Sequence, residues 1–163
     1  MKRTTTIIVI AISILLVLLY TITSTYSIII EVTEKDGITE IVNKISIRDL
    51  LMNEDGSYND IYYTLKNELS VTDEEANLLI NSKKLNEALQ IVLESIVDYK
   101  VNDNIDAKFT DQELYDLISK SVIQDGNLSD DLKSRVINKA SMYRNDVSDY
   151  IYDIEVSLLG DIA

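Results

Sequence analysis

The chain has 163 residues, a formal net charge of −13 and a hydrophobic fraction of 46%. This hydrophobic fraction is ordinary for a globular protein and excludes a disordered one. The chain contains no Cys and no His, which excludes disulfides, thiolate nucleophiles and the commonest general base and metal ligand. Its negative charge opposes binding to nucleic acid, because phosphates repel it. It also lacks Pro, so long uninterrupted helices are expected.

An uncharged, apolar run occupies the N-terminal region. Residues 4–30 contain no charged side chain, and about 20 apolar residues are enough to cross a hydrocarbon core. Lys2 and Arg3 precede the run, whereas all 28 acidic residues follow it. By the positive-inside rule, the N-terminus then lies in the cytoplasm. We therefore predict a cytoplasmic start and transmembrane signal anchor at residues 1–30, followed by an acidic extracytoplasmic domain at residues 31–163.

Two other interpretations of this run remain open. A cleaved signal peptide also has a charged start and an apolar stretch, although no A-x-A-like cleavage site is present. A buried core helix is the other alternative, and a dense apolar stretch directly after a basic terminus disfavours it. We favour the uncleaved anchor, which predicts a cell-membrane protein that contacts the bilayer through residues 7–30.

Residues 28–45 are rich in β-branched side chains on both sides of an Asp36-Gly37 pair. Asp-Gly between two such runs is a short-range hairpin signal. The pattern predicts a short β-hairpin at residues 28–45. The alternative is that the membrane-spanning helix continues to about residue 33.

Helical periodicity and helix caps dominate the rest of the chain. A Ser or Thr followed three residues later by an acidic residue predicts helix starts at Ser46/Asp49, Thr72/Glu75 and Thr110/Glu113, and Ser129 opens the last helix. Apolar residues at helical spacing predict four inner faces: Tyr58, Ile61, Tyr62, Leu65 and Leu69; Ala76, Leu79 and Ile80; Leu85, Ala88, Leu89, Val92, Leu93, Ile96 and Val97; and Leu114, Leu117, Ile118 and Val122. The predicted fold class is mainly α: a transmembrane helix followed by a small bundle of about four to five helices.

The last predicted helix runs from residue 130 to residue 157 and is the longest. Its apolar residues recur in steps of four and three, which is a heptad seam: Val136, Ala140, Tyr143, Val147, Tyr150 and Ile154. Ala and Tyr are poor coiled-coil knobs, so we favour the inner face of a bundle helix. The alternative is an interface with a protein partner or a second copy through Val136, Tyr143, Val147, Tyr150 and Ile154.

Residues 102–113 place oxygen-bearing side chains in the order of an EF-hand calcium loop. Loop positions 1, 3, 5 and 12 are occupied by Asn102, Asn104, Asp106 and Glu113. However, Ala107 stands where the sharp turn needs Gly, bulky Phe109 follows, and Glu113 is already explained as the capping partner of Thr110. We favour a polar linker between two helices, with these four residues as calcium candidates. No other metal site and no cofactor is predicted.

No enzyme motif stands out in the sequence. Without Cys or His, a Ser–Lys pair would be the remaining nucleophilic route, and no S-x-x-K is present. No catalytic residue is therefore predicted. We expect a binding or scaffolding role outside the cell, and the abundance of Ile, Asn, Lys and Tyr is typical of an AT-rich bacterial genome. The alternatives are an anchored or secreted carboxylate-based hydrolase and a calcium-dependent interaction module.

Overall fold

A computed structural model of the protein describes residues 29–30, 45–142, 144–152 and 157–158. The α-helices in this part of the chain are α4 (Ile47–Leu51), α5 (Asp60–Leu69), α6 (Asp73–Ile80), α7 (Lys83–Val101), α8 (Asp111–Gln124), α9 (Asp130–Met142) and α10 (Val147–Tyr152). A 3₁₀-helix, η1 (Ile105–Ala107), lies between α7 and α8. Two short strands, β1 (Ile29–Ile30) and β2 (Ser157–Leu158), pair in parallel. The predicted mainly helical fold is thus confirmed.

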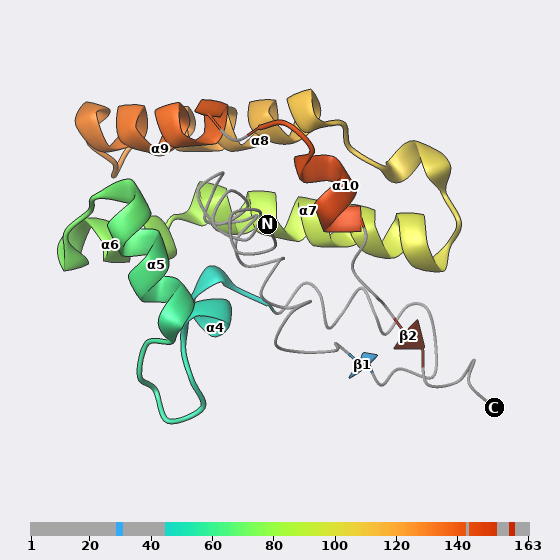
Figure 1. Ribbon diagram of the computed structural model, residues 1–163, viewed down its shortest axis with the longest axis horizontal. Helices are drawn as coiled ribbons and strands as arrows, with labels where there is room; N and C mark the ends of the chain where they lie inside the picture. Colours follow the sequence, from blue (N-terminus) through green and yellow to red (C-terminus); the bar gives the residue numbers. More distant parts are fainter. Residues whose placement is uncertain (1–28, 31–44, 143, 153–156, 159–163) are drawn as a thin grey trace.

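Helix α7 is the centre of the helical part (Figure 1). Helices α8 and α9 pack against each other on one side of it, and α8 also packs against α7. Helices α4 to α6 gather near the start of α7, and α5 reaches across to α9. Helix α10 packs against both α7 and α8. The chain therefore returns twice to α7, once through α8 and once through α10.

The predicted capping boxes begin three of the helices. At Ser46, Thr72 and Thr110 the side-chain oxygen accepts a hydrogen bond from the amide three residues later, and the acidic side chain there accepts one from the capping residue. Ser129 accepts from the amide of Leu132 at 3.1 Å and caps α9. Each cap satisfies backbone donors that an open helix end would leave unpaired. These local predictions are confirmed.

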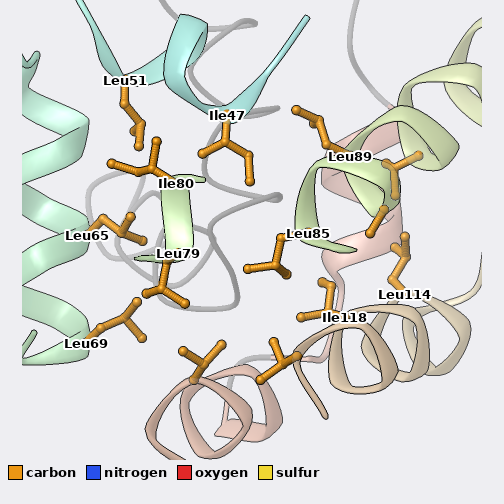
Figure 2. Close-up of a cluster of buried hydrophobic side chains, with 14 of the residues drawn as sticks. Ile47, Leu51, Leu65, Leu69, Leu79, Ile80, Leu85, Leu89, Leu114 and Ile118 are labelled. Atoms are coloured by element: carbon orange, nitrogen blue, oxygen red, sulfur yellow. The ribbon is translucent and has the colours of Figure 1, made fainter. Parts of the chain in front are cut away.

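The hydrophobic core follows the predicted inner faces closely (Figure 2). All seven residues predicted for α7 are buried, and so are all three predicted for α6. In α5 and α8 most of the predicted residues are buried, while Tyr58, Ile61 and Leu117 are partly buried against the core. Ile47 and Leu51 of α4 complete the cluster. The helix start predicted at Ser46 therefore opens a short helix that packs into the core.

The single last helix predicted for residues 130–157 is wrong. Helix α9 ends at Met142 and a separate helix, α10, begins at Val147, so the longest described helix is α7 with 19 residues. Of the predicted seam, Val136, Ala140 and Val147 are buried within the single chain. Of the other seam residues, Tyr143 and Ile154 and the side chain of Tyr150 lie outside the described part. With this split and with α4, the described residues contain seven α-helices, against the four to five expected for the bundle.

A long-range cap explains this break. The Asp111 carboxylate accepts hydrogen bonds from the amides of Asp146 at 2.9 Å and Ser148 at 2.7 Å. Asp146, directly before α10, takes the left-handed conformation with φ 68°, which no right-handed helix contains. The amides at the start of α10 thus find an acceptor in α8, an element distant in sequence. This pairing turns α10 back onto the core.

The predicted N-terminal elements fall mostly outside the described residues. Of the hairpin at residues 28–45, Ile29, Ile30 and Ile45 are described, and the first two pair with Ser157 and Leu158 in parallel. Of the anchor at residues 7–30, only Ile29 and Ile30 are described. Within the described ranges, no helix is long and apolar enough to span a bilayer.

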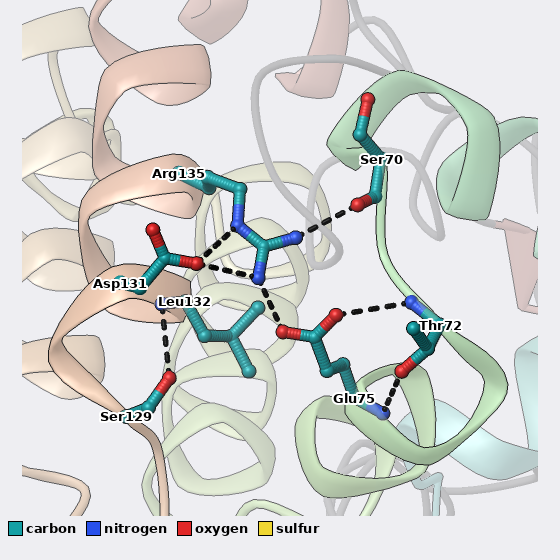
Figure 3. Close-up of polar contacts among 7 residues, drawn as sticks. All are labelled: Ser70, Thr72, Glu75, Ser129, Asp131, Leu132 and Arg135. Atoms are coloured by element: carbon teal, nitrogen blue, oxygen red, sulfur yellow. Dashed lines mark hydrogen bonds and ion pairs between the residues drawn. The ribbon is translucent and has the colours of Figure 1, made fainter.

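Charged side chains join α6 to α9 around Arg135 (Figure 3). Its guanidinium donates to the Ser70 carbonyl at 2.7 Å, to Asp131 at 3.0 Å and to Glu75. Glu75 is also the capping-box acid of α6. The Arg135 guanidinium lowers the pKa of Glu75, and the hydrogen bond from Thr72 adds to this. One cation thereby links the end of α5, the start of α6 and the first turns of α9.

A buried acid fixes the turn between α8 and α9. Asp125 is buried and accepts hydrogen bonds from the Ser82 hydroxyl and from the Asn127 amide. Ser82 is itself the N-cap of α7, since its oxygen accepts from the amide of Leu85 at 3.1 Å. Burying a polar side chain costs free energy unless it is hydrogen-bonded. The turn after α8 is therefore joined directly to the start of the central helix.

Candidate functional site

A surface groove runs along the second half of α7. It has a volume of about 550 Å³, which is within the range of roughly 300–1,000 Å³ common for ligand pockets. One wall is α7, with Ile91, Glu94, Ser95, Val97 and Asp98. The other is the segment after α7, with Asn102, Asp106, Ala107 and Phe109. One wall of the groove is thus part of the segment 102–113, which holds the four calcium candidates.

The α7 wall combines an apolar and an acidic face. Ile91, Glu94 and Asp98 follow one another at i, i+3 and i+7, so they share one side of the helix. Ile91 is 43% exposed, although most of the apolar residues of α7 are buried. Glu94 is exposed as well. An exposed isoleucine next to carboxylates is a surface that other groups can contact.

Hydrogen bonds around Asp98 shape the second wall. Its carboxylate accepts from the side-chain amides of Asn102 at 2.9 Å and Asn104 at 2.8 Å. These two bonds lower the pKa of Asp98, so it is a carboxylate at neutral pH. The Asn104 side chain in turn accepts from the Asp106 amide at 3.2 Å and caps η1. Asp98 therefore holds the loop against the end of α7.

The side chain of Tyr152 fastens the far end of the loop to α7. Its buried hydroxyl accepts from the Phe109 amide at 3.0 Å and lies 2.6 Å from the Ser95 oxygen. Because Ser95 donates to the Val92 carbonyl, the tyrosine is the donor to Ser95. Burial raises the pKa of Tyr152, which keeps the hydroxyl protonated. Both Ser95 and Phe109 line the groove, so α10 supports it from behind.

A second hydrogen bond joins α10 to the same segment. The Ser148 hydroxyl donates to the Phe109 carbonyl at 2.5 Å. The amide and the carbonyl of Phe109 are therefore both bound by side chains of α10. Satisfied backbone groups on both sides of one residue leave the groove wall little freedom to move.

The four calcium candidates do not converge in the way that an EF-hand needs. The Asn102 and Asn104 amides are turned to Asp98, and the Glu113 carboxylate accepts from the Thr110 amide at 3.2 Å. The left-handed residue is Asp103, with φ 54°, whereas the EF-hand turn would place it at Ala107. Within the described residues, no group of three or more acidic side chains could hold a metal ion.

Sequence reasoning found the polar segment between α7 and α8 but not the contacts that hold it in place. The signals for capping at Thr110 and for polarity at residues 102–106 are local and were visible. The contacts from Tyr152 and Ser148 to Phe109 span 43 and 39 residues, so no local sequence pattern predicts them. Comparison of the chain with protein-family models, with curated protein sequences and with solved structures gave no match.

Proposed function

We propose that the protein is a single-pass membrane protein that displays a helical binding domain outside the cell. The observation that carries the binding role is the groove between α7 and residues 102–109, with exposed Ile91 next to Glu94 and Asp98. Its walls are fixed by the bonds of Asp98 and Tyr152. A rigid surface loses little entropy when a partner binds to it.

The membrane anchor is supported by the sequence. Residues 4–30 are uncharged, basic residues precede them, and the acidic residues follow. A chain inserted in this way keeps its basic end in the cytoplasm and its acidic part outside. The negative charge of that part then disfavours its adhesion to anionic lipid headgroups, which leaves the groove open to other partners.

Binding accounts for the groove better than hydrolysis does. A carboxylic acid that protonates a leaving group near pH 7 needs a raised pKa. The pKa of Asp98 is lowered instead, because the Asn102 and Asn104 amides donate to its charged form. An acid held in this state suits recognition of a positive charge.

Single-cysteine variants test the topology, because the natural chain contains no Cys. Ile91→Cys places a thiol in the groove wall, and Lys2→Cys places one before the apolar run. A membrane-impermeant maleimide applied to intact cells should label Ile91→Cys. It should label Lys2→Cys only after permeabilisation. Labelling in the reverse order would refute the proposed orientation.

The same thiol tests the binding role. A photo-crosslinker attached to Ile91→Cys on intact cells should give a discrete adduct. Ile123→Cys is the matched control, since Ile123 is also an exposed isoleucine, at 60%, and lies on α8 outside the groove walls. An adduct at residue 91 that is absent at residue 123 supports a partner in the groove. Equal adducts at both positions, or none, would contradict it.

A further inference from the structure

The charges that line the groove point to a partner of definite chemistry, and this step rests on the binding role proposed above. Three carboxylates face it, those of Glu94, Asp98 and Asp106, together with the apolar side chains of Ile91 and Phe109. No Lys or Arg is among the lining residues of the described part. We propose that the groove binds a cationic amphipathic peptide segment, with an apolar side chain against Ile91 and Lys or Arg side chains opposite the carboxylates.

The end of α7 adds to the attraction for a cation. The helix ends at Val101, and the last carbonyls of an α-helix carry partial negative charge. Asp98 lies in the last turn and stays ionised because its pKa is lowered. Two cations lie nearby. Lys100 is in the same last turn of α7 but is not among the groove-lining residues. Lys108 lies 3.4 Å from Asp149 and over the rings of Tyr99 and Tyr152. The carboxylates of this wall can therefore attract the positive charge of a partner.

The shape of the groove favours a peptide over a compact ligand. Its α7 wall extends from Ile91 to Asp98, which is about 10 Å at the rise of an α-helix. Small-molecule sites are mostly apolar and enclose their ligand. Here acidic and apolar groups share an exposed strip, which matches the two faces of an amphipathic segment.

Two other occupants fit the observations less well. A metal ion needs several ligating side chains around one point, and within the described residues no group of three or more acidic side chains could hold one. A second copy of the chain would bring another charge of −13 to an acidic groove. A cationic segment is attracted by the same charges that repel a second copy of the chain.

The test uses the full-length protein in phosphatidylcholine nanodiscs, with empty nanodiscs as the blank. The probe is a synthetic peptide of about 14 residues, close to four helical turns, with Leu on one face and Lys on the other. One matched peptide has Glu in place of Lys, and another has Ser in place of Leu. Binding is measured by fluorescence anisotropy. The Leu–Lys peptide should bind, and both matched peptides should bind at least about tenfold more weakly.

Charge-matched variants separate the groove from the general acidity of the chain. Glu94→Gln with Asp106→Asn should weaken binding by roughly tenfold, because two exposed ion pairs are lost. Glu54→Gln with Asp130→Asn removes the same charge from exposed sites outside the groove and should change the affinity less than about twofold. Asp98 is left intact because it holds the loop.

The outcomes are distinct. Equal weakening by the two double variants would show that attraction is unspecific and would overturn the proposal. Equal binding of the Glu-containing peptide would also overturn it, since charge would then play no part. Should the Ile91→Cys crosslink succeed while the Leu–Lys peptide fails to bind, the partner chemistry is wrong and the binding role stands. Matching circular dichroism spectra of the double variants and the wild type confirm that the groove variants are folded.

Discussion

Two long-range contacts hold the helical part together, and they use opposite chemistry. The Arg135 contact joins α9 to α6 through charges, with the Arg135 and Glu75 side chains 28% and 24% exposed. The Tyr152 contact joins α10 to Ser95 and Phe109 through a buried neutral hydroxyl. Water and salt screen the first contact more than the second, whose hydroxyl belongs to a residue that is 4% exposed. The neutral contact should therefore contribute more to stability than the charged one.

The largest effect is expected where α10 meets the core. Val147→Glu places a carboxylate at a position that is 1% exposed. A buried unpaired charge costs several kcal/mol, against a total stability of about 5–15 kcal/mol for a typical domain. We expect thermal unfolding, followed by circular dichroism, to show a severely destabilised protein.

A matched control and the oligomeric state complete this experiment. Met142→Glu adds the same charge at a side chain that is 65% exposed and should be nearly neutral. If the seam around Val147 were an interface between chains, sedimentation would show a wild-type dimer that the variant converts into a folded monomer. That result would reject an intramolecular role for α10.

The next largest effect concerns the Tyr152 hydroxyl. Tyr152→Phe leaves the Phe109 amide without its acceptor, and an unsatisfied buried donor costs about 1–3 kcal/mol. The amide hydrogen of Phe109 should exchange faster in the variant, as measured by native-state hydrogen exchange. Tyr63→Phe is the control, since Tyr63 is 54% exposed. Unchanged exchange at Phe109 would mean that the loop is held by other contacts.

A smaller effect is expected from the charged contact. Arg135→Met keeps the aliphatic part of the side chain and removes the bonds to Ser70, Glu75 and Asp131. Because the partners are partly exposed, we expect a loss of about 1 kcal/mol that shrinks as salt is added. Chemical denaturation at low and high salt measures it, with the exposed Lys120→Met as the control. A loss that exceeds the Tyr152→Phe loss would reverse the proposed ranking.

Low pH should abolish the stability contributed by the Arg135 contact and leave that of the Tyr152 contact unchanged. The pKa of Glu75 lies below its ordinary value of 4.5, mainly because of Arg135. Such a group contributes stability above pH 4.5, and the contribution is lost as the pH falls through the folded pKa. The difference between wild type and Arg135→Met should therefore be larger at pH 7 than at pH 3. The difference for Tyr152→Phe should stay nearly constant, because its hydroxyl does not titrate there.

The sequence predicted those parts of the fold that depend on neighbouring residues. Capping boxes at Ser46, Thr72 and Thr110 act over three residues, and the buried face of α7 follows from helical periodicity. The break after Met142 was missed because its cause, the Asp111 carboxylate, lies 35 residues away from Asp146. The burial of Asp125 depends on Ser82, which is 43 residues distant.

The candidate site was predictable only in part, for the same reason. The polar residues at 102–106 and the oxygen spacing were visible in the sequence, and they predicted a polar linker with a calcium loop as the alternative. The groove itself depends on how η1 faces α7, which is decided by the bonds of Asp98 and Tyr152. The side chains with the calcium-loop spacing instead hold the loop in place, because the amides of Asn102 and Asn104 donate to the Asp98 carboxylate.

The smallest effect is expected from calcium. The loop at residues 102–113 is held by its own hydrogen bonds, so calcium would have to break the Asp98 and Glu113 pairings before it could bind. A single site at 100 times its dissociation constant would add about 2.7 kcal/mol. We expect millimolar calcium to shift the melting temperature of the full-length protein no more than magnesium does, since both screen its charge alike. A calcium-specific rise that Glu113→Gln abolishes would show that the loop rearranges into a metal site.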